Sequence, residues 1–98
     1  MKRQSWKRVE RKVAKELGGV RNPLSGSPSL HTAGDVIHPD LFVEVKSRSK
    51  LPFWETWLNV KERGRVEGKI PILVMHKKGS HDYVVMISLK DFKKLLKV

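Results

Sequence analysis

Cysteine is missing from this chain of 98 residues. Its absence excludes a disulfide framework and a cysteine-ligated zinc site, and it is typical of an intracellular protein. Long apolar runs are missing too, since the longest apolar-rich stretches, near residues 70–75 and 84–89, are too short to span a bilayer. The first residues also lack the apolar core of a signal peptide. We therefore expect an intracellular protein with no membrane partner.

Acidic residues are scarce. The sequence has 10 Asp and Glu against 21 Lys and Arg, which gives a formal net charge of +11. The excess is spread over the whole sequence, and a folded domain with this charge most often binds a polyanion. The length predicts one domain over residues 1–98, whose core is small enough that a dimer would add useful burial.

Apolar periodicity and turn residues predict alternating helices and strands. The predicted elements are a helix over 4–17, a loop over 20–34, strands over 35–38 and 41–47, a helix over 53–66, strands over 70–75 and 83–87, and a short terminal helix. This order predicts the α/β (α+β) class, with a central mixed sheet of about four strands flanked by helices.

Several side chains have predicted places in this fold. Trp6 belongs to the apolar stripe of the first helix and is expected in the core. Pro71 indicates a strand end or an edge strand. Trp54 and Trp57 either pack on the sheet or line a dimer interface. Ser88 and Asp91 are predicted to form a capping box that starts the last helix.

Two carboxylates and a lysine are the strongest candidates for chemistry. If the hairpin turns at residues 39–40, Asp35 faces Glu44 across the strands, with Cβ atoms roughly 5 Å apart. Lys46 lies on the same face as Glu44, because side chains alternate along a strand. Facing acids destabilise a sheet unless a cation compensates them. The pattern therefore favours a divalent-metal site, whereas an ordinary cross-strand ion pair is the structural alternative.

Two other acids compete for a place in this site. Asp40 lies four residues from Glu44 along one strand, roughly 13 Å away, and is therefore interpreted as a turn residue. Glu10 falls within the apolar stripe of the first helix, where an unpaired carboxylate is costly. Either it forms a salt bridge at the edge of the core or it completes the metal shell.

These motifs resemble those of a known family. Glu10, the run Ser25-Gly26-Ser27, Gly34-Asp35 and the run Glu44 to Arg48 resemble the PD-(D/E)XK nuclease superfamily, and most of all the small Holliday junction resolvases of archaea and their viruses. The resemblance covers nearly the whole chain, with Gly34 standing where the family has proline. It implies a restriction-endonuclease-like core and a homodimeric, Mg²⁺-dependent endonuclease, with Mn²⁺ as a substitute, that cuts four-way DNA junctions.

The resemblance also implies roles for single residues. Asp35, Glu44 and the Val45 carbonyl would ligate metal, and Glu10 would complete the shell through water. Lys46 would orient or activate the attacking water, or neutralise charge in the transition state. Ser25 matches a loop serine that assists catalysis, with Ser27 as its rival for that place and as a further DNA contact.

Basic residues are expected to contact DNA phosphates as a set. They are Arg3, Lys7, Arg8, Arg11, Lys12, Arg48, Lys50, Lys61, Arg63 and Arg65. Such contacts predict steeply salt-dependent binding and recognition by shape rather than by base readout. A nickase or repair-type nuclease on other branched or linear DNA, and a non-catalytic DNA-binding module, are the alternative functions.

Overall fold

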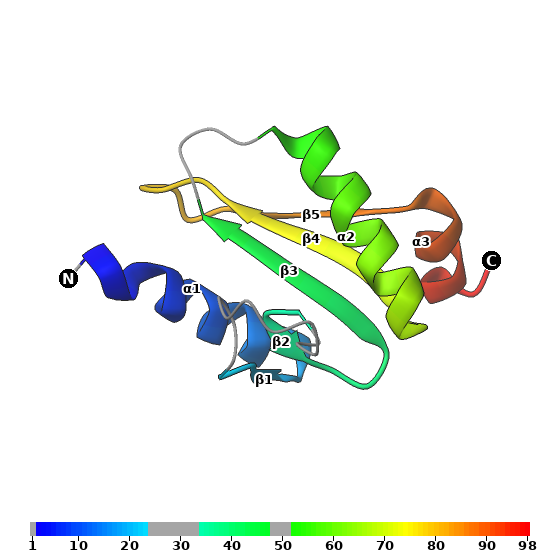
Figure 1. The fold of residues 1–98 in the computed structure, drawn as a ribbon, viewed down its shortest axis with the longest axis horizontal. Coiled ribbons are helices and arrows are strands. Elements are labelled where there is room, and N and C mark those ends of the chain that lie inside the picture. The colour runs from blue at the N-terminus through cyan, green and yellow to red at the C-terminus, as the bar shows by residue number, and fades with distance from the viewer. Residues whose placement is uncertain (1, 24–33, 48–51) are drawn as a thin grey trace.

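The computed structural model describes residues 2–23, 34–47 and 52–98, with the backbone alone for residues 2–5. Over these ranges the chain forms three helices and one five-stranded sheet (Figure 1). The elements are α1 (Lys2–Leu17), β1 (Val20–Arg21), β2 (Val36–Ile37), β3 (Leu41–Ser47), α2 (Phe53–Glu67), β4 (Ile70–His76), β5 (Tyr83–Ile87) and α3 (Leu89–Leu96). The predicted mixed α+β class is confirmed.

The sheet has the strand order β1-β2-β3-β4-β5. β3 and β4 are parallel, and every other neighbouring pair is antiparallel. The prediction of about four strands was wrong by one, because β1 lies inside the predicted loop over 20–34. Its two residues are too few to show the alternation by which a strand is recognised.

One face of the sheet is covered by α1. Val9, Val13 and Ala14 of this helix are buried against a layer of β-branched residues. That layer consists of Val36, Val43, Val45, Ile72 and Val74. It is continuous across β2, β3 and β4, so this side of the sheet is closed by hydrophobic packing.

The opposite face is covered by α2, whose Trp57 and Val60 are buried with Phe42 and Leu73. The helix lies close to β4 at Gly64, where a Cβ would come within 2.6 Å of the Pro71 Cβ. Replacing the fully buried Phe42 by alanine would lower the free energy of unfolding by about 3–5 kcal/mol. This packing fixes α2 over β3 and thereby positions the polar residues of both elements.

The burial of the tryptophans differs from the prediction at one position. Trp57 packs on the sheet, which was one of its two predicted places, whereas Trp54 is exposed. Trp6 is not a core residue, since 39% of it is exposed. The first turns of α1 extend beyond β1 and β2 (Figure 1), and the Trp6 ring is flanked by the Lys7 amine and the Arg21 guanidinium.

The carboxyl-terminal half agrees with the prediction at Pro71 and differs from it at the start of α3. Pro71 lies near the start of β4, which is the strand-end alternative, and it precedes Ile72, the first β4 residue paired with β5. Ser88 is the N-cap of α3 without a side-chain capping bond, so the predicted capping box was wrong. No residue of α3 is buried, although the helix has a strongly apolar face.

No helix in the described ranges is both long enough and apolar enough to cross a membrane.

Candidate functional site

The turn between β2 and β3 sets the register of the site. The His38 Nδ1 accepts hydrogen bonds from the backbone N–H groups of Asp40 (3.0 Å) and Leu41 (3.2 Å), which stabilises the turn. Asp40 is an exposed turn residue, as predicted. Val36 pairs with Val43, which confirms the predicted register at that position.

Beyond Val36 the chain departs from regular pairing. An unbroken register would place Asp35 opposite Glu44, but the Asp35 N–H donates to the Val43 carbonyl at 2.8 Å. The preceding Gly34 has a φ of 85°, and a Cβ there would lie 2.6 Å from the Val43 oxygen. Only glycine fits both conditions. The Gly34-Asp35 bend therefore presses the chain against β3.

The Asp35 side chain takes the place of a backbone carbonyl as a hydrogen-bond acceptor beside β3. Its Oδ2 accepts the Val45 N–H at 2.7 Å, in a buried hydrogen bond. The buried Asn22 closes the other side of the bend, since its Nδ2 donates to the Gly34 carbonyl and its N–H to the Asp35 carbonyl. Sequence reasoning missed Asn22, which stood in the predicted loop with no pattern to distinguish it.

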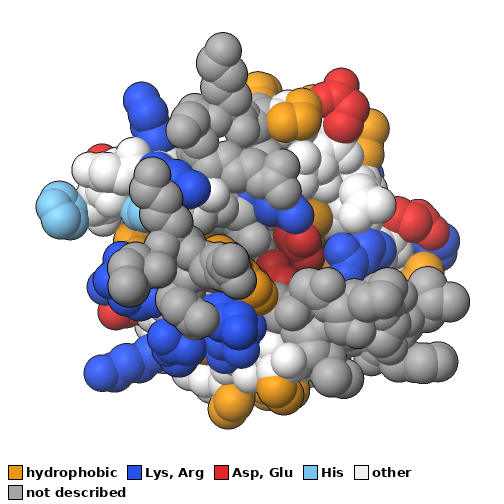
Figure 2. All heavy atoms as spheres, turned by 60° about the vertical axis from the view of Figure 1, so that its left-hand side comes forward, with side chains coloured by type: hydrophobic (Ala, Val, Ile, Leu, Met, Phe, Trp, Pro, Cys, Tyr) orange, Lys and Arg blue, Asp and Glu red, His pale blue; other side chains and the backbone are white. Residues whose placement is uncertain are grey.

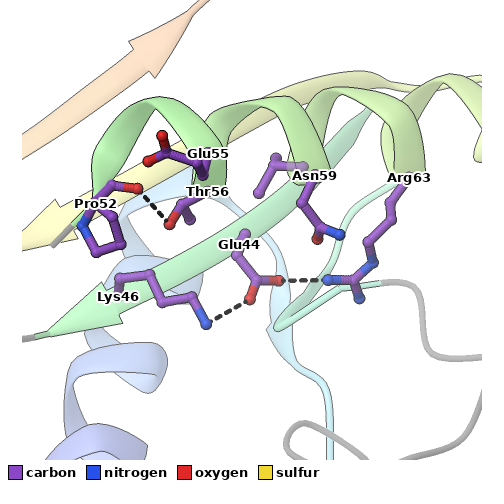
Figure 3. Close-up of a pocket in the computed structure, with 8 residues that line it drawn as sticks. Glu44, Lys46, Pro52, Glu55, Thr56, Asn59 and Arg63 are labelled. Atoms are coloured by element: carbon purple, nitrogen blue, oxygen red, sulfur yellow. Dashed lines mark hydrogen bonds and ion pairs between the residues drawn. The ribbon is translucent and has the colours of Figure 1, made fainter.

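Glu44 is buried on the α2 face of β3, with a cation at each carboxylate oxygen (Figure 3). The Lys46 Nζ lies 3.1 Å from Oε2, and the Arg63 Nη1 lies 3.3 Å from Oε1. Burial is the largest influence on this carboxyl and raises its pKa, and the negative charge of Asp35 raises it further. Lys46 and Arg63 act in the opposite direction. Lys46 thus lies beside Glu44, as predicted, and Asp35 is near enough for its charge to act on Glu44, although the two acids are not regular cross-strand partners.

A hollow of about 320 Å³ opens beside Glu44, between β3 and α2. Its lining residues are Glu44, Lys46, Pro52, Glu55, Thr56, Asn59, Val60 and Arg63. On α2, Glu55, Asn59 and Arg63 follow one another at four-residue intervals, so they lie along one side of the helix. Figure 2 shows acidic side chains set among Lys and Arg side chains on one face of the molecule.

Arg63 was predicted as a DNA contact and not as a partner of Glu44. Glu55, Thr56 and Asn59 were not predicted at all. The four-residue spacing of Glu55, Asn59 and Arg63 was visible in the sequence, but nothing there placed this side of the helix against β3. The contact depends on tertiary packing at Trp57 and Gly64, which no local pattern shows.

Glu10 is buried, and its Oε1 accepts a hydrogen bond from the Arg21 Nε at 2.8 Å. The salt-bridge alternative for this residue is therefore present in the structure. Across residues 2–23, 34–47 and 52–98, no group of three or more His, Cys, Asp or Glu side chains is arranged to hold a metal ion. Within these residues, Glu10, Asp35 and Glu44 therefore do not form a three-carboxylate metal site.

The donors that are present suit magnesium. Mg²⁺ is typically held by one or two carboxylates, several waters and substrate phosphates rather than by a complete protein cage. The charge of Asp35 raises the pKa of Glu44, and Glu44 already pairs with two cations. The structure places the Val45 N–H against Asp35; ligation by the Val45 carbonyl stays a prediction.

The remaining predicted residues fall into three groups. Arg8, Arg11 and Lys12 are exposed on α1, and Lys7 is half-buried beside Trp6. On α2, Lys61 is exposed, and the Arg65 guanidinium pairs with Glu62. The others lie outside the described residues or side chains: Arg3, Ser25, Ser27, Arg48 and Lys50.

Comparison of the chain with protein-family models, curated protein sequences and solved structures found no match.

Proposed function

We propose that this protein is a divalent-metal-dependent DNA endonuclease with a restriction-endonuclease-like core, of the PD-(D/E)XK type. One observation carries the proposal: buried Glu44 lies near Asp35, with the Lys46 Nζ 3.1 Å from its carboxylate. The surroundings of Glu44 raise its pKa and so disfavour its ionised form. The ionised form is the one that would bind a metal ion. Perturbed carboxyl groups in a hollow are typical of active sites.

In this proposal Asp35 and Glu44 hold Mg²⁺ or Mn²⁺. Such an ion would lower the pKa of a bound water and stabilise charge on a phosphodiester. Asp35 is fixed for this task, because its Oδ2 bond to Val45 sets the side-chain rotamer. Lys46 supplies a point charge at the edge of the hollow, where it would contact a phosphate oxygen or the attacking water.

The proposed substrate is branched DNA, with four-way junctions first. The net charge of +11 supports a polyanionic partner. Arg8 and Arg11 are exposed on α1, where they are accessible to phosphates. The described strands carry no feature that indicates base readout, so branch geometry is the proposed basis of selection.

A homodimer completes the proposal. Leu95 and Leu96 on α3 are exposed, as is Val84 on β5, which is an edge strand of the sheet. Apolar surface of this kind marks interaction sites. Light scattering should show a dimer that Leu95→Glu converts to a monomer, whereas Lys90→Glu on the opposite side of α3 leaves it unchanged. A monomeric wild type would contradict this part.

Cleavage of defined DNA substrates tests the function. Wild type and Glu44→Gln are incubated with a labelled four-way junction, a fork and a linear duplex, in Mg²⁺ and in EDTA. We expect Mg²⁺-dependent paired nicks on the junction by wild type alone. Equal cutting of linear duplex would indicate a nickase or repair-type nuclease. Tight junction binding without cutting would indicate a non-catalytic module and would overturn the enzymatic proposal.

A further inference from the structure

Glu44 has cations from two different elements at its two oxygens, and these cations are held differently. Lys46 belongs to the same strand, whereas Arg63 reaches across from α2 (Figure 3). A divalent ion at this carboxylate needs at least one of the two oxygens. A divalent ion at either oxygen competes with the cation already there and repels it, so the more weakly held of the two cations is the one expected to leave.

Arg63 is the more loosely held of the two. Its Nη1 lies 3.3 Å from Glu44 Oε1 and its side chain is 39% exposed, against 3.1 Å and 27% for Lys46. A strong charge-assisted hydrogen bond measures about 2.7–2.9 Å, and arginine reaches its full strength through two parallel bonds. Arg63 is joined to Glu44 by one long hydrogen bond, so little is lost when the guanidinium leaves.

The side chain can move while its helix stays in place. α2 is anchored by buried Trp57 and Val60 and by the close approach of Gly64 to Pro71. The Arg63 guanidinium also lies over the Phe42 ring, 5.0 Å from its centroid. This ring is a flat, apolar support across which the planar group can turn toward the hollow.

The hollow offers a destination for the displaced cation. Lys46, Thr56 and Asn59 line it beside Arg63, and together they provide cationic and neutral hydrogen-bond donors. Glu55 also lines the hollow and is exposed at the first turn of α2. Donors of this kind suit a phosphate oxygen, which arginine binds in a forked geometry.

We propose that Arg63 is an exchangeable counter-ion: it neutralises Glu44 in the metal-free protein, releases Oε1 when a divalent cation binds, and then contacts a DNA phosphate. This inference rests on the proposed function, because it requires the metal site at Asp35 and Glu44. Arg63 is in this scheme a positioning residue before DNA binds and a substrate contact afterwards.

Binding of Mn²⁺ in the absence of DNA tests the exchange. The affinity is measured by calorimetry for wild type, Arg63→Gln, Arg65→Gln and Glu44→Gln. Because the ion competes with Arg63, Arg63→Gln should bind Mn²⁺ about two- to five-fold more tightly, in line with the strength of a half-exposed ion pair. Arg65 lies on the same helix and pairs with Glu62 instead, so Arg65→Gln should bind as wild type does.

The DNA arm of the experiment separates exchange from a simple gain in metal affinity. With Ca²⁺ in place of Mg²⁺, Arg63→Gln should bind junction DNA about three- to ten-fold more weakly than wild type, and Arg63→Lys should recover part of the loss. Equal Mn²⁺ affinity in Arg63→Gln and wild type, or an equal gain in Arg65→Gln, would overturn the exchange and leave the metal site standing. No Mn²⁺ binding by wild type would overturn the proposed function itself.

Discussion

The two faces of the sheet each bury one glutamate beside an arginine, and the two pairs are built differently. On the α1 side, Glu10 meets Arg21 at 2.8 Å, and the Arg21 side chain is 17% exposed. On the α2 side, Glu44 meets Arg63 at 3.3 Å, with that side chain 39% exposed. The first pair is short and enclosed, whereas the second is long and opens into a hollow.

The surroundings of the two glutamates differ in the same direction. Glu10 lies beside a valine-rich layer that runs over three strands. On the other face the apolar cluster of Phe42, Trp57, Val60 and Leu73 is smaller, and the next outward residues of β3 on that face are Glu44 and Lys46. The comparison teaches that burial of a carboxylate is not enough to mark a site. What marks Glu44 is a combination: the negative charge of Asp35 acts on it, Lys46 lies at its second oxygen, and a hollow opens beside it.

The largest expected effect is on catalysis. If the proposed function holds, Glu44→Gln or Asp35→Asn should reduce Mg²⁺-dependent cleavage by roughly a thousandfold, because each would remove a charged ligand of the proposed metal ion. Single-turnover cleavage of a labelled junction measures this loss, with far-ultraviolet circular dichroism as the control for folding. Normal cleavage by Glu44→Gln would remove the distinction between the two faces.

The second prediction concerns Glu10. Glu10→Ala leaves Arg21 without its carboxylate in a mostly enclosed place, so it should lower the free energy of unfolding by about 2 kcal/mol. That value lies below the range for fully buried pairs, because Arg21 keeps some contact with solvent. Urea denaturation measures the change, and Mn²⁺ affinity at the other face should stay as in wild type. A folded Glu10→Ala protein with weakened Mn²⁺ binding would return Glu10 to the metal shell.

Salt dependence gives the third prediction. Arg8→Gln combined with Arg11→Gln removes two exposed cations of α1. The slope of log affinity against log salt for junction DNA should become shallower by about 2, since each phosphate contact contributes roughly 0.9. Arg65→Gln should change the slope less, because Glu62 already neutralises that guanidinium. An unchanged slope in the double variant would place the DNA on another surface.

The smallest expected effect is a pH-dependent gain in stability. The folded protein raises the pKa of Glu44 through burial and then through Asp35, so it binds this proton more tightly than the unfolded chain does. The ionised carboxylate therefore destabilises the fold at pH values above its folded pKa. Glu44→Gln should raise the melting temperature at neutral pH, and the difference should shrink as the pH falls toward the ordinary Glu pKa of 4.5.

A matched glutamate controls for this fourth prediction. Glu67→Gln changes an exposed residue at the end of α2 and should leave the melting temperature nearly unchanged at every pH. If Glu44→Gln lowered the melting temperature at neutral pH, the ion pairs with Lys46 and Arg63 would outweigh burial. The contrast between a stabilising Glu10 pair and a destabilising Glu44 would then be wrong.

Local patterns in the sequence were sufficient for most elements. The stripe containing Val9 and Val13 predicted α1, and the alternation from Leu41 onward predicted β3. The turn at residues 39–40 gave the register at Val36, because hairpin geometry is set within a few residues. The same local reasoning placed Lys46 beside Glu44.

What the sequence could not show depended on partners distant in the chain. Trp6 falls within the apolar stripe of α1, as predicted, but the first turns of this helix extend beyond β1 and β2, and Trp6 stays exposed (Figure 1). Asp35 was expected to pair regularly with Glu44. The bend at Gly34 instead joins its N–H to the Val43 carbonyl, and its side chain accepts the Val45 N–H. Arg63 reaches Glu44 only because α2 packs closely on β4.

The central claim is that Asp35 and Glu44 hold one divalent cation. A crystal of the protein grown with Mn²⁺, measured at a wavelength that gives an anomalous signal for manganese, tests this most directly. The account predicts one peak about 2.0–2.6 Å from an oxygen of both carboxylates, with Arg63 turned away from Glu44. A structure with clear anomalous peaks elsewhere and Arg63 still bonded to Glu44 would contradict it.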